Sequence, residues 1–260
     1  MGIDPEVFRD AGDEASAGGA RAALGTGLTG HRLILGVDRL DYAKGIPQKI
    51  LAVQSLLARH PEWLRKVVFQ QIAAPSRTGV PDCMDQKRRI EALMRRVNGE
   101  LGDDDWTPIR YLHRSYSRPL LARLYREADV GLVTPLRDGI NLVAKEFVAA
   151  QRPDSPGVLV LSQGAGAAEE LEAAVIVNPF IPADMAAGIA RALAMPLEER
   201  RERHASMLRR VVAGTAAHWA RRFLGDLAGY AEAVTSREAA AVGSLRASLF
   251  STIATLRPVP

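Results

Sequence analysis

The chain has 260 residues, of which 47% are apolar and 25% are charged, and it carries a formal net charge of +4. These values are close to the globular average and the length suffices for one sizeable core, so we expect one domain plus a tail rather than two full domains. The modest charge and an aromatic content of 5% disfavour nucleic-acid binding, which needs a basic stripe with interleaved aromatic side chains.

Other features bear on the compartment. No apolar segment approaches the roughly 20 residues that cross a membrane, and the N-terminus lacks the basic and apolar regions of a secretion signal. The single cysteine, Cys83, has no partner for an internal disulfide. We therefore expect the protein in the cytoplasm and not at a membrane. The histidines are scattered without ligand spacing, so we expect no metal site.

Short apolar runs alternate with helical segments along the chain, which predicts an α/β domain with a Rossmann-like parallel sheet flanked by helices. After an Ala- and Gly-rich head, the predicted strands cover residues 33–37, 67–72, 109–112, 130–134, 158–161 and 174–177. The predicted helices cover residues 48–59, 82–99, 118–128, 143–150, 183–194 and 198–212. We assign residues 1–235 to this domain and residues 236–260 to a tail of unknown role.

The first polar segment of interest follows the strand predicted at 33–37. It reads Asp38-Arg39-Leu40-Asp41-Tyr42-Ala43-Lys44-Gly45 and brings two cations, Arg39 and Lys44, to the start of a helix. Arginine can bind a phosphate through two nitrogens and lysine adds a mobile charge, so the two together suit a diphosphate. The alternative is that Arg39 pairs with Asp38 or Asp41 and only ties down the loop.

A second segment follows the strand predicted at 130–134 and reads Leu136-Arg137-Asp138-Gly139-Ile140-Asn141-Leu142-Val143-Ala144-Lys145-Glu146. A strand that ends in a Gly-containing turn before a helix presents free backbone N–H groups and a positive dipole end, which together suit phosphate. Glu146 lies about one and a half helical turns past Asn141, close enough to accept hydrogen bonds from a sugar or ribose diol. The alternative is an ordinary turn with a solvated glutamate.

The polar residues of these segments share one position in the predicted fold. Arg39, Lys44, Arg77, Asp138 and Glu146 all lie just past the ends of predicted parallel strands. Ligands of doubly wound sheets bind beyond the carboxyl ends of the strands. The sequence therefore predicts one ligand site at that edge.

Several motifs, in this order, resemble trehalose-6-phosphate synthases. They are Gly-Val-Asp-Arg-Leu-Asp-Tyr-x-Lys-Gly from residue 36, Gln71-Ile72-Ala73-x-Pro75-Ser76-Arg77, Trp106-Thr107-Pro108 and the run from Asp129 to Glu146. The likeness extends from Gly2-Ile3-Asp4-Pro5 to about Val234 and covers only half of a family protein.

The resemblance implies the GT-B architecture, in which two Rossmann-like lobes face each other across a cleft. This chain is similar to the C-terminal lobe, which holds the nucleotide-sugar donor, and an N-terminal lobe would be its intramolecular partner. The implied reaction moves glucose from UDP-glucose to glucose 6-phosphate with retention, and it gives trehalose 6-phosphate and UDP. The resemblance implies no cofactor and no metal.

Site roles follow from the same resemblance. Arg39 and Lys44 would bind the donor diphosphate and stabilise the leaving nucleotide, which makes them the candidate catalytic residues. Asp138 would accept hydrogen bonds from the transferred glucose, and Glu146 from the ribose diol. Arg77 would bind the 6-phosphate of the acceptor. The backbone N–H groups expected near sugar or phosphate oxygens are those of Gly139, Ile140, Asn141, Leu142 and Val143.

Other functions stay open from the sequence. The chain could be a stand-alone UDP-sugar binding or regulatory module without turnover, or a structural remnant whose pocket is collapsed. Related synthases that use GDP-glucose, or that make glucosylglycerol phosphate, also remain candidates, because the base preference depends on a few backbone contacts that the sequence does not show. Apolar residues recur near helical spacing at Trp219, Phe223 and Leu227, so that face could be exposed or buried in a homodimer.

Overall fold

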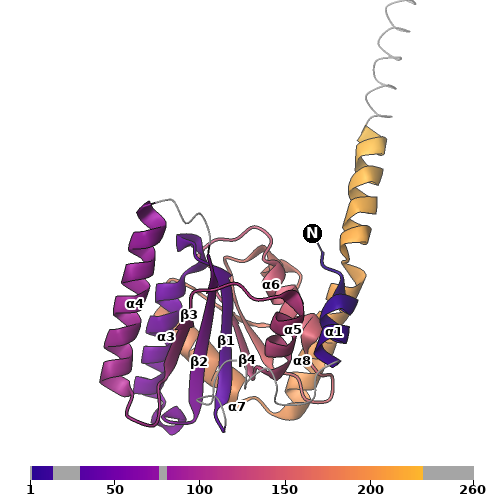
Figure 1. Ribbon diagram of the computed structural model, residues 1–260. Helices are drawn as coiled ribbons and strands as arrows, with labels where there is room; N and C mark the ends of the chain where they lie inside the picture. Colours follow the sequence, from indigo (N-terminus) through magenta and orange to yellow (C-terminus); the bar gives the residue numbers. More distant parts are fainter. Residues whose placement is uncertain (1, 14–29, 76–80, 231–260) are drawn as a thin grey trace, which may run out of the picture. The chain divides into compact units, whose positions relative to one another are not determined.

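One parallel sheet organises the first part of the chain (Figure 1). The computed structural model describes residues 2–13, 30–75 and 81–230. The strands are β1 (Arg32–Arg39), β2 (Val67–Ala74), β3 (Ile109–Leu112), β4 (Val130–Val133), β5 (Val158–Ser162) and β6 (Val175–Val177). They lie in the order β3-β2-β1-β4-β5-β6, and each neighbouring pair is parallel.

The central strands are buried along nearly their whole length rather than at alternate residues. β4 and β5 are buried at every residue, and β2 at all but its last. A parallel sheet shows this pattern when helices cover both of its faces. The helices are α1 (Pro5–Asp13), α3 (Ile46–Arg59), α4 (Pro81–Leu101), α5 (Arg118–Glu127), α6 (Leu142–Ala150), α7 (Pro182–Ala194) and α8 (Leu197–Ala213), with short 3-10 turns η2 (Tyr42–Lys44), η3 (Pro61–Trp63) and η4 (Gly166–Glu169).

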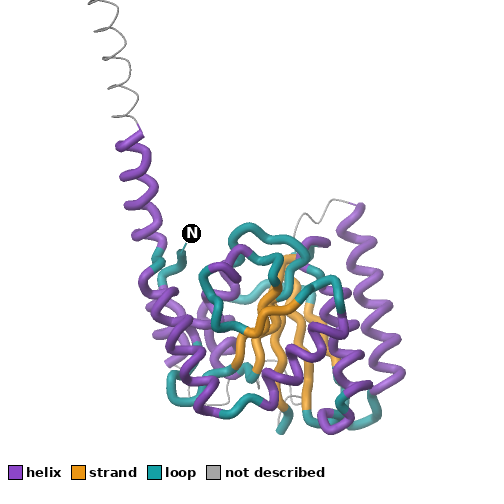
Figure 2. Tube along the Cα trace, turned by 180° about the vertical axis from the view of Figure 1, so that it is seen from behind, coloured by secondary structure: helices purple, strands orange, loops and turns teal. Residues whose placement is uncertain are grey.

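The helices form two layers, with the sheet between them (Figure 2). α3, α4 and α7 cover one face, while α1, α5, α6 and α8 cover the other. The apolar stripe of α3 shows what holds such a layer: Ile50, Val53 and Leu57 are at most 1% exposed. Full burial of each such side chain contributes about 1.5–3 kcal/mol.

The strand order has a consequence for ligand binding. The chain runs outward from β1 through β2 to β3, and then crosses back to continue from β4 on the other side of β1. β1 and β4 are therefore neighbours whose following loops diverge to opposite faces of the sheet. In doubly wound sheets the ligand crevice lies at this point, outside the carboxyl ends of the strands.

The sequence prediction of this layout is confirmed. Every predicted strand and helix up to residue 212 is present, with ends within two residues of those predicted. β1 runs to Arg39, past the predicted end at residue 37, because its pairing with β2 continues as far as Arg39 opposite Ala74.

A second unit begins at Ala216. Its described residues, 216–230, are helical, and Trp219, Phe223 and Leu227 are exposed on them. The domain limit predicted at residue 235 lies outside the described residues. Among the residues that are described, no helix has the length and apolar character needed to span a membrane.

Candidate functional site

The loop after β1 is built from a short capped turn. The side chain of Asp41 accepts a hydrogen bond from the backbone N–H of Ala43, which caps η2, and Lys44 is the last residue of that turn. Gly45 follows with φ of 65°, a left-handed conformation that glycine adopts without strain. The turn thereby places Lys44 just ahead of α3.

This loop packs directly against the loop that follows β4. The backbone N–H of Leu136 donates to the carbonyl of Ala43 over 2.7 Å. A Cβ atom at position 45 would lie 3.1 Å from the carbonyl oxygen of Thr134, so the absence of a side chain on Gly45 permits the approach. The two segments singled out in the sequence therefore meet at the β1–β4 crevice.

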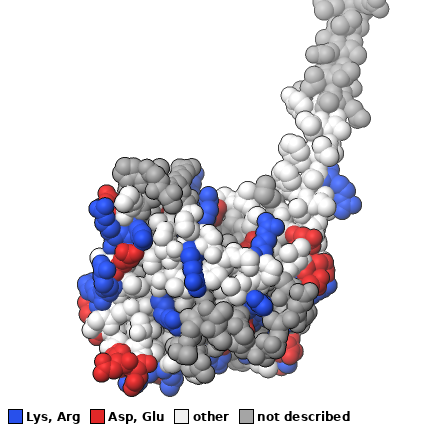
Figure 3. Space-filling model, viewed as in Figure 1, with Lys and Arg blue, Asp and Glu red and all other residues white. Residues whose placement is uncertain are grey.

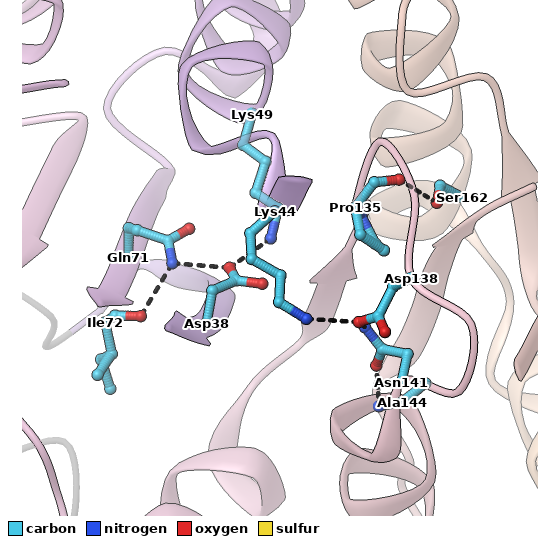
Figure 4. A network of polar contacts seen from close by, with 10 residues as sticks. All are labelled: Asp38, Lys44, Lys49, Gln71, Ile72, Pro135, Asp138, Asn141, Ala144 and Ser162. Atoms are coloured by element: carbon cyan, nitrogen blue, oxygen red, sulfur yellow. Dashed lines mark hydrogen bonds and ion pairs between the residues drawn. The ribbon is translucent and has the colours of Figure 1, made fainter. Parts of the chain in front are cut away.

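An ion pair joins the loops that follow β1 and β4 at the opening between them, which we call the mouth of the site. Lys44 Nζ lies 2.5 Å from Asp138 Oδ2, and the amide of Asn141 donates to the same oxygen over 3.0 Å (Figure 4). Although burial favours the protonated acid, Lys44, the Asn141 amide and the backbone N–H of Ile140 together hold the pKa of Asp138 below its ordinary value. Asp138 is thus a fixed carboxylate acceptor.

Asn141 also organises the start of α6. Its side-chain oxygen accepts from the backbone N–H of Ala144 over 3.1 Å, which makes it the N-cap of the helix (Figure 4). Its φ of 51° is unusual for a residue other than glycine, although asparagine tolerates it best. Within the described chain, the N–H groups of Leu142 and Val143 donate to no other residue. They are available to an anion.

The end of β5 and the loop that follows it hold the Asp138 segment in place through hydrogen bonds. The N–H of Asp138 donates to the carbonyl of Gly164, and the N–H of Gly166 donates to the carbonyl of Asp138. A Cβ at Gly166 would fall 2.0 Å from the carbonyl oxygen of Gly139, so no other residue fits without displacing the backbone. Ser162 Oγ donates to the carbonyl of Pro135 over 2.6 Å.

Glu146 lies one turn further along α6. The hydroxyl of Tyr125, from α5, donates to Glu146 Oε2 over 3.2 Å. Burial raises the pKa of Glu146 above its ordinary value, against the opposing effects of the Tyr125 hydrogen bond and the positive charge of Arg118. The carboxylate is therefore partly desolvated, which argues against the reading of Glu146 as a solvated residue.

A buried ionic network lies beneath the mouth. Lys49 of α3 contacts Asp38 Oδ2 over 2.6 Å, and the amide of Gln71 donates to the same oxygen over 2.9 Å (Figure 4). Asp38 is the residue before Arg39, so this network anchors the end of β1 from which the cationic loop departs.

Arg39 itself is solvent-exposed at the end of β1. It makes no hydrogen bond or ion pair with any other residue in the described segments. The two carboxylates suggested as its tether are engaged elsewhere, Asp38 with Lys49 and Asp41 with the backbone of Ala43. The structure thus contradicts the loop-tethering alternative and leaves the guanidinium available to a ligand.

The structure brings most of the predicted site together. Lys44, Asp138, Asn141 and the first residues of α6 share the mouth between the loops after β1 and β4, with Gly139 and Ile140 exposed on its rim. Arg77 lies outside the described residues.

Sequence reasoning missed Lys49 and Tyr125. Lys49 carried a usable signal, since it falls within the apolar stripe of α3 at three residues from Ile46, where a charge needs a buried partner. Tyr125 carried none that distinguishes it from a core aromatic residue.

Two further observations concern other ligand classes. No group of three or more His, Cys, Asp or Glu side chains suited to a metal ion occurs in the part of the chain that is described. On the face shown in Figure 3, basic and acidic side chains alternate over α4, where Lys87 lies near Glu91 and Arg96 contacts Glu100. These basic residues form a mixed, solvated helix face, not a basic stripe.

The strand order and the polar mouth at its switch point define a doubly wound α/β domain of the Rossmann type. The model of glycosyltransferase family 20 matches residues 1–229, and the chain belongs to that family.

Relatives and solved structures agree with this assignment. The trehalose-6-phosphate synthase of Klebsiella pneumoniae is 47% identical over 228 residues, which cover 87% of this chain and 48% of that protein. A synthase structure from Burkholderia xenovorans in complex with glucose-6-phosphate has a TM-score of 0.84 at 44% identity, covering 87% of this chain and 50% of the other. A structure of the E. coli protein bound with UDP-2-fluoro glucose has a TM-score of 0.83 at 45% identity, again covering 87% and 50%. The chain thus spans about half the length of these relatives.

Proposed function

We propose that this chain is the donor-binding lobe of a glycosyltransferase that moves glucose from UDP-glucose to glucose 6-phosphate with retention, giving trehalose 6-phosphate and UDP. The observation that carries the proposal is the mouth itself: an exposed arginine, a lysine and free helix amides stand at the β1–β4 crevice beside a fixed carboxylate. The ligands of the two similar structures, a UDP-sugar analogue and glucose-6-phosphate, support the substrate classes.

The donor diphosphate would bind the cations. Arg39 can hold two phosphate oxygens at once, while Lys44 leaves Asp138 to contact the diphosphate. When the bond to glucose breaks, negative charge grows on the departing UDP. Cations already in place stabilise that charge in the transition state more than in the ground state, which is how this kind of site accelerates transfer.

The sugar and the ribose would be held by the α6 side of the mouth. Asp138 is held as a carboxylate and its side chain is partly exposed, so it can accept hydrogen bonds from glucose hydroxyls once Lys44 has turned to the phosphates. The N–H groups of the segment from Gly139 to Val143 would contact sugar or phosphate oxygens. Glu146 would accept hydrogen bonds from the ribose diol.

The acceptor would be bound mainly elsewhere. In this proposal Arg77 contacts the 6-phosphate of glucose, and an N-terminal lobe supplies the remainder of the acceptor site. Because the chain spans about half of its relatives, we expect it to bind donor by itself without turnover. The reaction needs no metal in this account, so a chelator should leave it unchanged.

Calorimetric titration with UDP and UDP-glucose tests the donor site, with GDP as the control for the base. We expect saturable binding of both uridine compounds and weaker binding of GDP. Absence of binding by all of them would contradict the proposal and favour a structural remnant.

Catalysis is tested in a chimaera that carries the N-terminal half of the Klebsiella relative ahead of this chain. UDP release from UDP-glucose should require both the added half and glucose 6-phosphate. Donor binding by the chimaera without glucose transfer would favour the UDP-sugar binding or regulatory module. In the same chimaera, Arg77→Ala should impair use of glucose 6-phosphate and leave UDP affinity unchanged; a large loss of UDP affinity would contradict its acceptor role.

A further inference from the structure

Tyr125 connects the core of the domain to the first turns of α6, the helix whose start lines the mouth. Its side chain is 1% exposed, and its ring packs edge-on against Phe147, with ring centroids 6.3 Å apart and planes at 75°. Its hydroxyl nevertheless donates a hydrogen bond to a carboxylate oxygen, Glu146 Oε2, over 3.2 Å. A hydroxyl at the tip of a core aromatic residue is thus aimed at the residue proposed to contact ribose.

The hydroxyl can only act as a donor toward Glu146. Burial, followed by the negative charge of Glu146, raises the pKa of Tyr125 well above its ordinary value, so the phenol stays protonated. Its ring is held by Phe147 and its helix, so the direction of the O–H group is fixed to within the rotation of one bond. Hydrogen bonds in binding sites are often as long as this one before a ligand is bound.

The surroundings of Glu146 explain why such a donor matters. Burial raises the pKa of Glu146, and the groups that oppose this effect are the Tyr125 hydroxyl and the charge of Arg118, both on α5. On the β1 side, the negative charge of Asp38 acts on Tyr125 and reinforces the protonated phenol. Without the hydroxyl, the carboxylate would lose a hydrogen bond that stabilises its charge and constrains its orientation, and only the charge of Arg118 would still oppose the effect of burial.

We propose that Tyr125 is a positioning residue that holds Oε2 of Glu146 so that the carboxylate faces the ribose diol of a nucleoside diphosphate. This inference rests on the proposed function, and it deepens it by assigning the ribose specificity to a pair of residues rather than to Glu146 alone. One carboxylate oxygen is tied to the core, and the other is left to the ligand.

The test compares UDP with 2′,3′-dideoxy-UDP in wild type and in Tyr125→Phe, which keeps the ring against Phe147 and removes only the oxygen. We expect Tyr125→Phe to lower UDP affinity by about three- to tenfold, the effect of one hydrogen bond, and to leave dideoxy-UDP affinity unchanged. The acid limb of UDP binding should also move to higher pH, because Glu146 becomes easier to protonate. A variant that was merely less stable would change neither the ratio of the affinities for UDP and dideoxy-UDP nor the pH at which UDP binding is lost in acid.

Tyr111→Phe is the matched control. Its hydroxyl is also buried, burial raises its pKa to about 12, and it has no hydrogen-bond partner among the described residues. It lies on β3, away from Glu146, so both affinities should match those of wild type.

A double-mutant cycle with Glu146→Gln keeps the test independent of folding. If Tyr125 acts through the carboxylate, adding Tyr125→Phe to Glu146→Gln should change UDP affinity less than it does in wild type. Additive effects, or equal losses for UDP and dideoxy-UDP, would overturn the inference. A wild-type chain that binds neither nucleotide would overturn the proposed function instead, whereas UDP binding without ribose discrimination would overturn only the inference.

Discussion

Two lysine–aspartate pairs flank the end of β1, and they differ in burial rather than in geometry. Lys49 and Asp38 are 2.6 Å apart, with side chains that are 0% and 3% exposed. Lys44 and Asp138 are 2.5 Å apart, but their side chains are 15% and 20% exposed. Figure 4 draws both pairs: the first joins α3 to the end of β1, and the second joins the loops that follow β1 and β4.

The difference in burial assigns the two pairs different roles. Removing one partner of a buried pair leaves an uncompensated charge that water cannot reach, so such a pair resists any exchange of partners. A partly solvated pair is worth little to stability, and a phosphate can replace its carboxylate without a stranded charge. The buried pair therefore fixes the frame, and the exposed pair is the one that a ligand can open.

The largest predicted effect concerns the buried pair. Lys49→Met should lower the free energy of unfolding by about 3–5 kcal/mol, because Asp38 is left buried without its cation. Denaturant titration measures the loss. Lys66→Met, at an exposed lysine, is the control and should have little effect. Recovery of stability in the double variant Lys49→Met with Asp38→Asn would support the stranded charge as the cause; a loss below about 1 kcal/mol in Lys49→Met would contradict it.

The next effect concerns the exposed cation at the mouth. Arg39→Ala should reduce UDP affinity by about ten- to a hundredfold, since a charge-assisted contact is worth roughly 1.5–3 kcal/mol. Stability should barely change, because Arg39 has no partner among the described residues. Calorimetry measures the affinity, with Arg95→Ala on the exposed face of α4 as the control. If Arg39→Ala unfolded the domain while the remaining folded molecules bound UDP as tightly as wild type, the interpretation of Arg39 as a tether of the loop would be correct instead.

Glu146→Gln should separate function from stability. UDP affinity should fall by roughly tenfold as the charged acceptor is lost. Stability at neutral pH should rise. The pKa of Glu146 is higher in the folded state than in the unfolded state, so Glu146 stabilises the fold fully only below its unfolded pKa. This contribution is lost as the pH rises through the folded-state pKa, and glutamine, which does not ionise, avoids the loss. Thermal unfolding across pH measures this: the gain should vanish in acid. A gain that persists in acid would show that the charge is not its source.

The smallest effect concerns the mouth pair. Asp138→Asn should raise UDP affinity by a few fold, because Lys44 no longer has to break an ion pair before it contacts the diphosphate. The free energy of unfolding should fall by less than about 1 kcal/mol. The same variant should lose the preference for UDP-glucose over UDP, because Asp138 contacts the sugar. Calorimetry with both ligands measures the two effects. Weaker UDP binding would mean that Asp138 holds Lys44 in place for the phosphate rather than competing with it.

The sequence predicted the layout of the fold and the meeting of the two loops, and particular residues show why. Apolar runs such as β4 and β5 are local signals, and in a parallel sheet they also determine which loops meet at one edge. Lys44 contacts a carboxylate that lies 94 residues further along the chain, so this pairing is set by the packing of two distant loops. The pairing of Lys44 with Asp138, and that of Tyr125 with Glu146, therefore appear only in the structure.

The most direct measurement follows the side-chain nitrogens of the lysines by NMR during a UDP titration. The lysines are at positions 44, 49, 66, 87 and 145, so the spectrum is simple. We expect the Nζ resonance of Lys44 to move in proportion to UDP saturation and that of Lys49 to stay where it is. A Lys44 resonance that does not respond to bound UDP, or a Lys49 resonance that moves as far, would contradict the division between an exchangeable pair and a fixed one.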